Sequence, residues 1–366
     1  VYVGAYAGRF STNAVANTAV GTGAGAAGAS SGYATFLGYY AGGQVTTGSA
    51  NTMIGSWSGY GTVGGSLNTY VGTESGQAAN GNQNTYNGYQ AGQNSATGSD
   101  NVFVGYRSGR STTTNSNTLI GAHSGWQNST GTLNTFVGTS SGAGNTTGSE
   151  NTFLGTAAGF ANTDGAYNTY VGRSAGRLNT SGSWNTVIGR NAGLNSTTAW
   201  DNTIIGGEAG LNNSTGAQNT FIGRSAGRAN TTGGFNTFVG LASGLGNATG
   251  AQNTALGAEA GWLNTTGSLN TFVGRNAGRA NSTGSDNTFI GATAGMSNTA
   301  GQQNTFVGRN AGGSNTTGQQ NTFLGYNVAA LLSTGSGNTM LGHQAAWGVS
   351  TGANNTCVGL SAGYNV

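Results

Sequence analysis

Apolar and polar residues recur along this chain with a period of 17 residues, which is neither the period of a helix nor the simple alternation of a strand. The segment Asn-Thr-Phe-Val-Gly at 270–274 returns as Asn-Thr-Phe-Ile-Gly at 287–291 and again at 304–308. About 22 such copies account for the whole chain, and the copies that begin at Asn68 and Asn101 are one residue short. Self-similarity at a fixed spacing is the signature of a repeat architecture.

Four positions of the repeat, numbered from its Asn, are nearly invariant. Position 4 is Val, Ile or Leu in every copy except at Asn87, and position 5 is always Gly. Position 8 is Ala or Ser except at Val328, and position 9 is Gly except at Ala329 and Ala346. Position 3 is looser and is mostly Phe or Tyr, while the remaining positions are polar. These fixed positions define one structural unit per repeat.

The repeat predicts a strand followed by two turns. Its density of glycine and turn residues excludes a helix with an apolar stripe. The run Asn-Thr-Phe-Val is typical of a short strand, the Gly at position 5 permits a sharp bend, and a run such as Asn264-Thr-Thr-Gly267 supplies the return turn. Stacked copies would form an all-β parallel β-solenoid, or β-roll, of about 22 coils of 17 residues. We expect one continuous domain over 1–366, a fragment of a longer fibre whose termini are missing.

Alternation along the strand places positions 2 and 4 on one side and position 3 on the other. Because position 4 accepts almost only aliphatic residues, we expect it to face the interior opposite the small residue at position 8. The aromatic column at position 3 would then face outward, where a stripe of that length needs a partner. The burial of one interior aliphatic side chain per coil also offsets only a small part of the entropic free-energy cost of ordering 17 residues. We therefore expect a homo-oligomer with position 3 at the interface: Phe36, Tyr70, Phe103, Phe136, Phe153, Tyr170, Phe221, Phe238, Phe272, Phe289, Phe306 and Phe323.

The Asn-Thr-x-aliphatic-Gly core followed by Ala-Gly resembles the head repeats of trimeric autotransporter adhesins and the Asn-Thr-rich repeats of phage tail-fibre proteins. This resemblance covers the whole chain at the level of the repeat, although the repeat here is longer than the usual adhesin head repeat. It implies a left-handed β-roll assembled as a homotrimer that binds surfaces. Handedness and copy number rest on the resemblance alone.

Composition narrows the functional classes. The chain has 72 Gly, no Pro, 5% charged residues and a net charge of +3, and its single cysteine is Cys357. It contains no apolar run of the roughly 18 residues that a spanning helix needs, and no basic tract of the kind that binds nucleic acid. Acids and the two histidines are scattered over distant copies, so we expect no enzyme, no metal and no cofactor.

Two patterns allow both a binding and a structural interpretation. Arginine recurs at positions 6 and 10, as in Arg224 and Arg228. These arginines suit either the binding of anionic glycans or the protection of exposed edges and the solubility of an otherwise neutral stack. Tryptophan recurs at the outward position 10, where it would stack on sugars: Trp126, Trp262 and Trp347. Their irregular spacing favours a structural role.

Asparagine forms two columns. The nearly invariant Asn at position 1 suits an amide ladder inside the stack. At position 12, nine asparagines stand in the N-x-S/T pattern, which indicates either glycosylation of an exported protein or plain turn chemistry: Asn128, Asn145, Asn179, Asn213, Asn230, Asn247, Asn264, Asn281 and Asn315.

The predicted function is that of a structural rod of an extracellular fibre, adhesin-like or filament-forming, which acts through self-association and surface attachment. It would lie outside the cell, on the cell surface or on a virion tail. Its partners would be its own copies and surface glycans, without nucleic acid or membrane insertion. Alternatives are a phage tail-fibre shaft or a glycan-binding module. Ice binding, which uses flat threonine arrays, is disfavoured because alternation places the position-2 threonine inward.

Overall fold

The computed structural model describes residues 1–28 and 30–364, and the chain divides into two compact units, Val1–Ser183 and Trp184–Val366. The strands of the first unit are β1 (Tyr2–Val3), β2 (Thr18–Val20), β3 (Thr35–Leu37), β4 (Thr52–Ile54), β5 (Thr69–Val71), β6 (Thr85–Asn87), β7 (Val102–Val104), β8 (Thr118–Ile120), β9 (Thr135–Val137), β10 (Thr152–Leu154) and β11 (Thr169–Val171). The strands of the second are β12 (Thr186–Ile188), β13 (Thr203–Ile205), β14 (Thr220–Ile222), β15 (Thr237–Val239), β16 (Thr254–Leu256), β17 (Thr271–Val273), β18 (Thr288–Ile290), β19 (Thr305–Val307), β20 (Thr322–Leu324), β21 (Thr339–Leu341) and β22 (Thr356–Val358).

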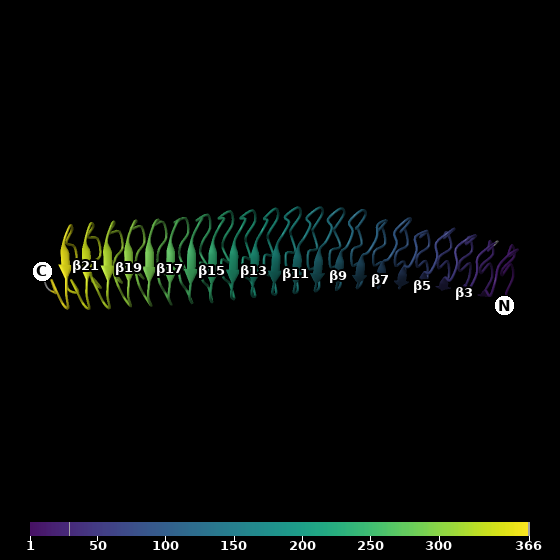
Figure 1. Ribbon diagram of the computed structural model, residues 1–366, viewed down its shortest axis with the longest axis horizontal. Helices are drawn as coiled ribbons and strands as arrows, with labels where there is room; N and C mark the ends of the chain where they lie inside the picture. The colour runs from purple at the N-terminus through teal and green to yellow at the C-terminus, as the bar shows by residue number, and fades with distance from the viewer. Residues whose placement is uncertain (29, 365–366) are drawn as a thin grey trace. The chain divides into compact units, whose positions relative to one another are not determined.

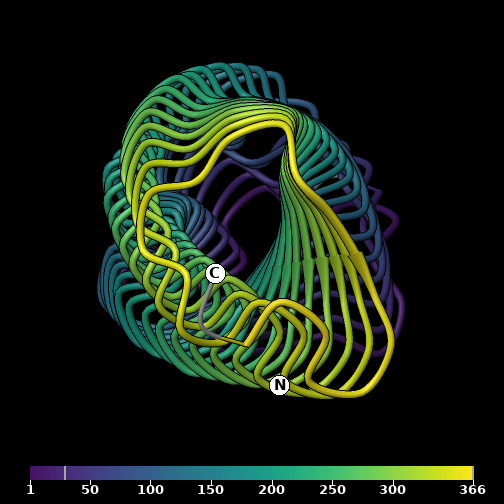
Figure 2. The same cartoon turned by 90° about the vertical axis from the view of Figure 1, so that its left-hand side faces the viewer.

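Within each unit, every strand pairs in parallel with the next strand of the chain, one repeat later (Figure 1). The register matches equal repeat positions, so that in β17 and β18 Thr271 lies beside Thr288 and Phe272 beside Phe289. Each repeat closes into one coil, with its strand along one side of the loop (Figure 2). The chain is thus an all-β parallel β-solenoid of about 21 coils of about 17 residues, which confirms the predicted fold class. A single continuous domain stays a prediction.

Two glycines of the coil have different reasons to be glycine. Gly274, at position 5, has φ +130°, and a Cβ there would lie 2.7 Å from the carbonyl carbon of Gly291 in the next coil. Gly278, at position 9, has φ +57°, and a Cβ there would lie 2.5 Å from the ring of Phe272. The first glycine therefore permits close stacking of coils, and the second makes room for the ring at position 3.

The aromatic column at position 3 fills the interior, so the predicted orientation of the strand is wrong. In β10, Phe153 is 0% exposed and its neighbour Leu154 is 47% exposed. Rings of successive coils stack inside the second unit, with centroids 4.7 Å apart between Phe289 and Phe306 and 4.6 Å apart between Phe306 and Phe323. The twelve aromatic residues expected at an oligomer interface are all no more than 2% exposed within their own chain: Phe36, Tyr70, Phe103, Phe136, Phe153, Tyr170, Phe221, Phe238, Phe272, Phe289, Phe306 and Phe323.

The volume of the coil interior explains why the position-3 rings face inward. The interior is wide enough for a ring because small residues face it, such as Ala277 at position 8, which is 0% exposed, and the glycine at position 9. Position 3 tolerates smaller residues because neighbouring coils fill the gap. Where position 3 is Ala255, the ring of Phe272 from the next coil lies closest to the position-9 glycine, Gly261. Variation at position 3 therefore reflects shared packing between coils and not exposure.

Two asparagine ladders line the interior. At position 1, the backbone N–H of Asn287 donates to Oδ1 of Asn270 at 3.0 Å, and its Nδ2 donates to the carbonyl of Gly301 at 2.8 Å. This arrangement repeats from coil to coil and confirms the predicted amide ladder. At position 12, Nδ2 of Asn281 donates to Oδ1 of Asn264 at 2.7 Å and to the carbonyl of Gly284 at 2.8 Å. The ladders supply hydrogen bonds to amides that would otherwise be buried without partners.

The short coils lose their residue at the tip of the return turn. In the coil that begins at Asn101, Nδ2 of that residue donates to the carbonyl of Thr114 at 2.8 Å, where other coils use the glycine of position 15. The strands on either side keep their register, with Phe103 paired to Leu119. Near the C-terminus the position-12 column ends at Asn315, and the next coil has the buried Leu332 in its place. Val328, Ala329 and Ala346, the exceptions at positions 8 and 9, are also buried in the coil interior.

Candidate functional site

One candidate site is the outer strand face, formed by the side chains at positions 2 and 4 of every strand. Threonine occupies position 2 in all full-length strands except β7, and position 4 is aliphatic except at Asn87 of β6. None of these residues is charged. Leu256 and Leu324 are 37% and 47% exposed on this face. The face is therefore a regular apolar and hydroxyl surface, which sequence reasoning had placed inside the coil.

The position-12 asparagines, expected as glycan acceptors, lie inside the coil. All nine are no more than 2% exposed: Asn128, Asn145, Asn179, Asn213, Asn230, Asn247, Asn264, Asn281 and Asn315. The Nδ2 atom that a glycan would modify is occupied; that of Asn145, for example, donates to Oδ1 of Asn128 at 2.7 Å. In the folded chain these side chains form an interior ladder, which neither of the two expectations, glycosylation or plain turn chemistry, had included.

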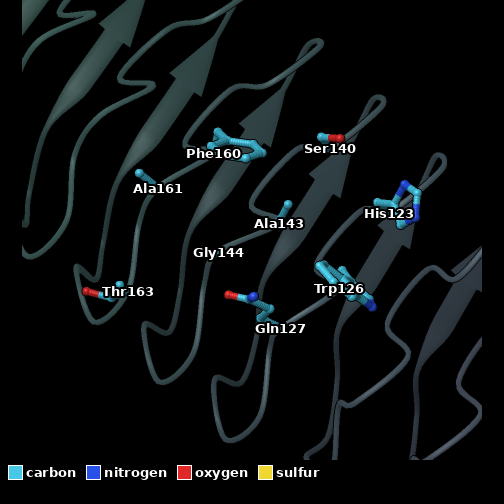
Figure 3. A pocket seen from close by; sticks show the side chains of 9 residues that line it. All are labelled: His123, Trp126, Gln127, Ser140, Ala143, Gly144, Phe160, Ala161 and Thr163. Atoms are coloured by element: carbon cyan, nitrogen blue, oxygen red, sulfur yellow. The ribbon is translucent and has the colours of Figure 1, made fainter.

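A second candidate site is a notch in the first unit, where aromatic side chains flank a coil of small residues. Its cavity of about 450 Å³ is lined by His123, Trp126, Gln127, Ser140, Ala143, Gly144, Phe160, Ala161 and Thr163. Trp126, Ala143 and Phe160 occupy position 10 of three successive coils, and Figure 3 shows Ala143 and Gly144 between the two aromatic residues. The volume lies within the range of about 300–1,000 Å³ that is typical of small-molecule sites.

Each aromatic wall of the notch packs against a neighbouring side chain. Arg177, at position 10 of the next coil, places its guanidinium carbon 5.4 Å from the centroid of the Phe160 ring. On the other side, the rings of His123 and Trp126 pack edge to face, with centroids 5.7 Å apart. The floor is Ala143, which is 5% exposed. The sequence carries the signal for this site in the small residues at outward positions 7, 10 and 11 of one coil, between coils that have Trp and Phe.

The other two position-10 tryptophans have covered faces. The guanidinium carbon of Arg279 lies 4.2 Å from the centroid of the Trp262 ring, and the Trp347 ring stacks on Tyr364 with centroids 5.2 Å apart. Of the three tryptophans that the sequence suggested for sugar stacking, Trp126 is the one that borders the notch.

The arginines of positions 6 and 10 are partly neutralised. Arg228 lies 3.3 Å and Arg190 3.4 Å from the carboxylate of Glu208, and Arg279 lies 2.9 Å from that of Glu259. Such exposed pairs contribute little stability, but they reduce the free positive charge on this edge of the second unit. The pattern therefore supplies a weaker anion-binding surface than the bare count of arginines indicates.

The described residues form neither a metal-binding cluster nor a membrane-spanning helix. Over residues 1–28 and 30–364, no three His, Cys, Asp or Glu side chains come close enough together to hold a metal ion. The same residues include no helix with the length and apolar character needed to cross a membrane.

The in-register stack and its two asparagine ladders define a repeat protein of the parallel β-solenoid class. No known protein-family model matches the chain, and no curated protein matches it either.

Proposed function

We propose that this chain is a structural segment of an extracellular fibre, of the adhesin or phage tail-fibre kind, and that its copies associate through the outer strand face. The observation that carries this proposal is the uncharged, regular array of threonine and aliphatic side chains along one side of each unit. A repeated apolar surface of this kind is typical of a contact surface. Its partner in the proposal is a second copy of the chain.

The area of the face supports this partner. Each strand presents about 10 Å of width at about 4.8 Å per layer, so the eleven strands β12 to β22 of the second unit present about 530 Å². Two such faces would bury about 1,060 Å² in total, which is close to the roughly 1,000 Å² that a specific interface needs. The resemblance to trimeric adhesins adds the expectation of three copies and a left-handed coil.

Matched substitutions test the proposal. Leu256→Arg with Leu324→Arg places two charges on the outer strand face, and Leu263→Arg with Leu331→Arg places two charges on the same coils at position 11, where the leucines are 43% and 44% exposed. Light scattering of the unaltered chain is expected to give two or three times the 36.1 kDa chain mass. The first pair should yield monomers and the second should not. A monomeric unaltered chain, or equal effects of both pairs, would refute association through this face.

Ice binding is a second candidate, because the outward threonine column removes the objection raised from alternation. Threonines of the position-2 row follow one another at about 4.8 Å, and the aliphatic position-4 row lies about 6.6 Å away on the same uncharged surface. An assay of ice recrystallisation tests this candidate: activity that Thr271→Lys abolishes would support it, and absence of activity in the unaltered chain would reject it.

A further inference from the structure

We infer that the notch between Trp126 and Phe160 is a binding site for one ring of a neutral saccharide. The inference goes beyond the proposed association and does not depend on it, because the notch uses positions 7, 10, 11 and 13 whereas the outer strand face uses positions 2 and 4.

The orientation of the walls supports a sandwich. The face of the Phe160 ring is turned along the stack, since Arg177 of the following coil lies over it. Trp262, at the same repeat position as Trp126, also turns its face toward the following coil, where Arg279 covers it. In the coil that follows Trp126, the equivalent residue is Ala143, which leaves that space open. The opposite face of Phe160 is turned toward the same alanine. The notch is therefore the space of one missing side chain between two aromatic walls.

The thickness of the notch favours a puckered ring over a flat one. Two coils separate the walls, which corresponds to about 9.6 Å at about 4.8 Å per layer. Each aromatic wall takes up half of its own thickness on the side that faces the notch, about 3.5 Å for the two walls together. The free gap between the surfaces of the walls is therefore about 6 Å. A planar aromatic ring, about 3.5 Å thick, would leave much of this gap empty. A pyranose is thicker because its C–H groups project from both faces, and those groups pack well on aromatic rings.

The polar groups agree with this ligand. The amide of Gln127 and the hydroxyls of Ser140 and Thr163 lie at the rim, where they can exchange hydrogen bonds with sugar hydroxyls. The lining includes no carboxylate and no guanidinium, and its one ionisable side chain is His123. With hydroxyl and amide groups as its other polar groups, the site suits a neutral sugar.

The test uses the full chain and four probes, the methyl glycosides of glucose, galactose, mannose and N-acetylglucosamine, followed by tryptophan fluorescence and saturation-transfer NMR. We expect saturable binding of at least one probe with a Kd in the millimolar range, as for a site that holds a single ring. Trp126→Ala and Ala143→Phe should each weaken this binding by about tenfold or more. Ala143→Phe fills the notch with a side chain that position 10 already accepts at Phe160, so it is expected to fold. Trp262→Ala is the matched control and should leave the Kd unchanged.

Three results would overturn the inference: no saturable binding of any of the four glycosides by the unaltered chain, unchanged binding in Ala143→Phe, or tighter binding of the planar probe indole than of every glycoside. The Leu256→Arg and Leu324→Arg chain is titrated in parallel. Because its notch is intact, loss of oligomers without loss of sugar binding separates a failure of one proposal from a failure of the other.

Discussion

The position-12 ladder offers a sharp test of the fold, because its middle and its end differ in the hydrogen bonds they make. Asn264 takes part in three: it donates to Oδ1 of Asn247 at 3.0 Å and to the carbonyl of Gly267 at 2.8 Å, and it accepts from Asn281 at 2.7 Å. At about 1 kcal/mol for each bond, plus about 1–3 kcal/mol for the acceptor left unpaired on Asn247, Asn264→Ala should cost about 4–6 kcal/mol.

Asn315 is the matched control at the end of the ladder. It donates to Oδ1 of Asn298 at 2.7 Å and to the carbonyl of Gly318 at 3.2 Å, but its own Oδ1 is buried without a partner. Asn315→Ala removes two bonds and leaves Oδ1 of Asn298 unpaired, but it also removes the unsatisfied Oδ1 of Asn315, which offsets that cost, so we expect a loss of about 2 kcal/mol.

Hydrogen exchange is the suitable assay, because coil arrays open locally and do not unfold as one two-state unit. The free energy of opening is measured for peptides that cover the substituted coil and its two neighbours in each variant. A larger loss for Asn264→Ala than for Asn315→Ala is expected. Equal losses would refute the reasoning that the amides act as a hydrogen-bonded chain.

Three further predictions concern the backbone and the core. Gly274→Ala forces a Cβ against the backbone of the next coil at φ +130° and should lower the free energy of opening of its coil, measured by hydrogen exchange, by more than about 3 kcal/mol. Ala157 has φ 56°, so Ala157→Gly should stabilise by about 0.5–1 kcal/mol in the same assay, and a loss would contradict the assigned backbone. Burial raises the pKa of the Tyr86 and Tyr70 hydroxyls above their ordinary value. Stability from these groups is therefore full below about pH 10 and lost as pH rises further, and pH-dependent melting should show a shallower alkaline loss in Tyr86→Phe.

The repeat length, the strands and the position-1 amide ladder were predictable from the sequence. A fixed spacing requires equal coils, and the Thr-x-aliphatic run forms the strand of every complete coil except those of β6 and β7. The Asn at position 1 was expected in an internal ladder because a buried amide column can satisfy itself by stacking, and the contact from Asn287 to Asn270 confirms this.

The side of the strand that faces inward could not be predicted from how much each repeat position varies among the copies. Position 4 is restricted to aliphatic residues although Leu154 is half exposed, and position 3 varies although Phe153 is fully buried. A core position in a stack shares its volume with the coils above and below, so a neighbouring ring can compensate for a small residue. The same reasoning explains the error at position 12, where turn-like residues such as Asn145 hydrogen-bond along the stack instead of facing solvent.

The notch was only partly predictable. Tryptophan at position 10 was expected to face outward, and Trp126 borders the cavity. The notch exists because Ala143 and Gly144 have small side chains or none. Their effect can be recognised only when residues at equal repeat positions are known to lie side by side in adjacent coils.

The short coils have a consequence for how such a chain can evolve. The turn tip accommodates a missing residue while Phe103 stays paired with Leu119. Small insertions and deletions at that point therefore leave the strand pairing of the neighbouring coils unchanged. Gain or loss of a whole repeat is equally well tolerated, since adjacent coils meet with equal repeat positions side by side. Unequal recombination between near-identical repeats can therefore lengthen or shorten the protein in single-coil steps, and selection can adjust its span without redesigning its core.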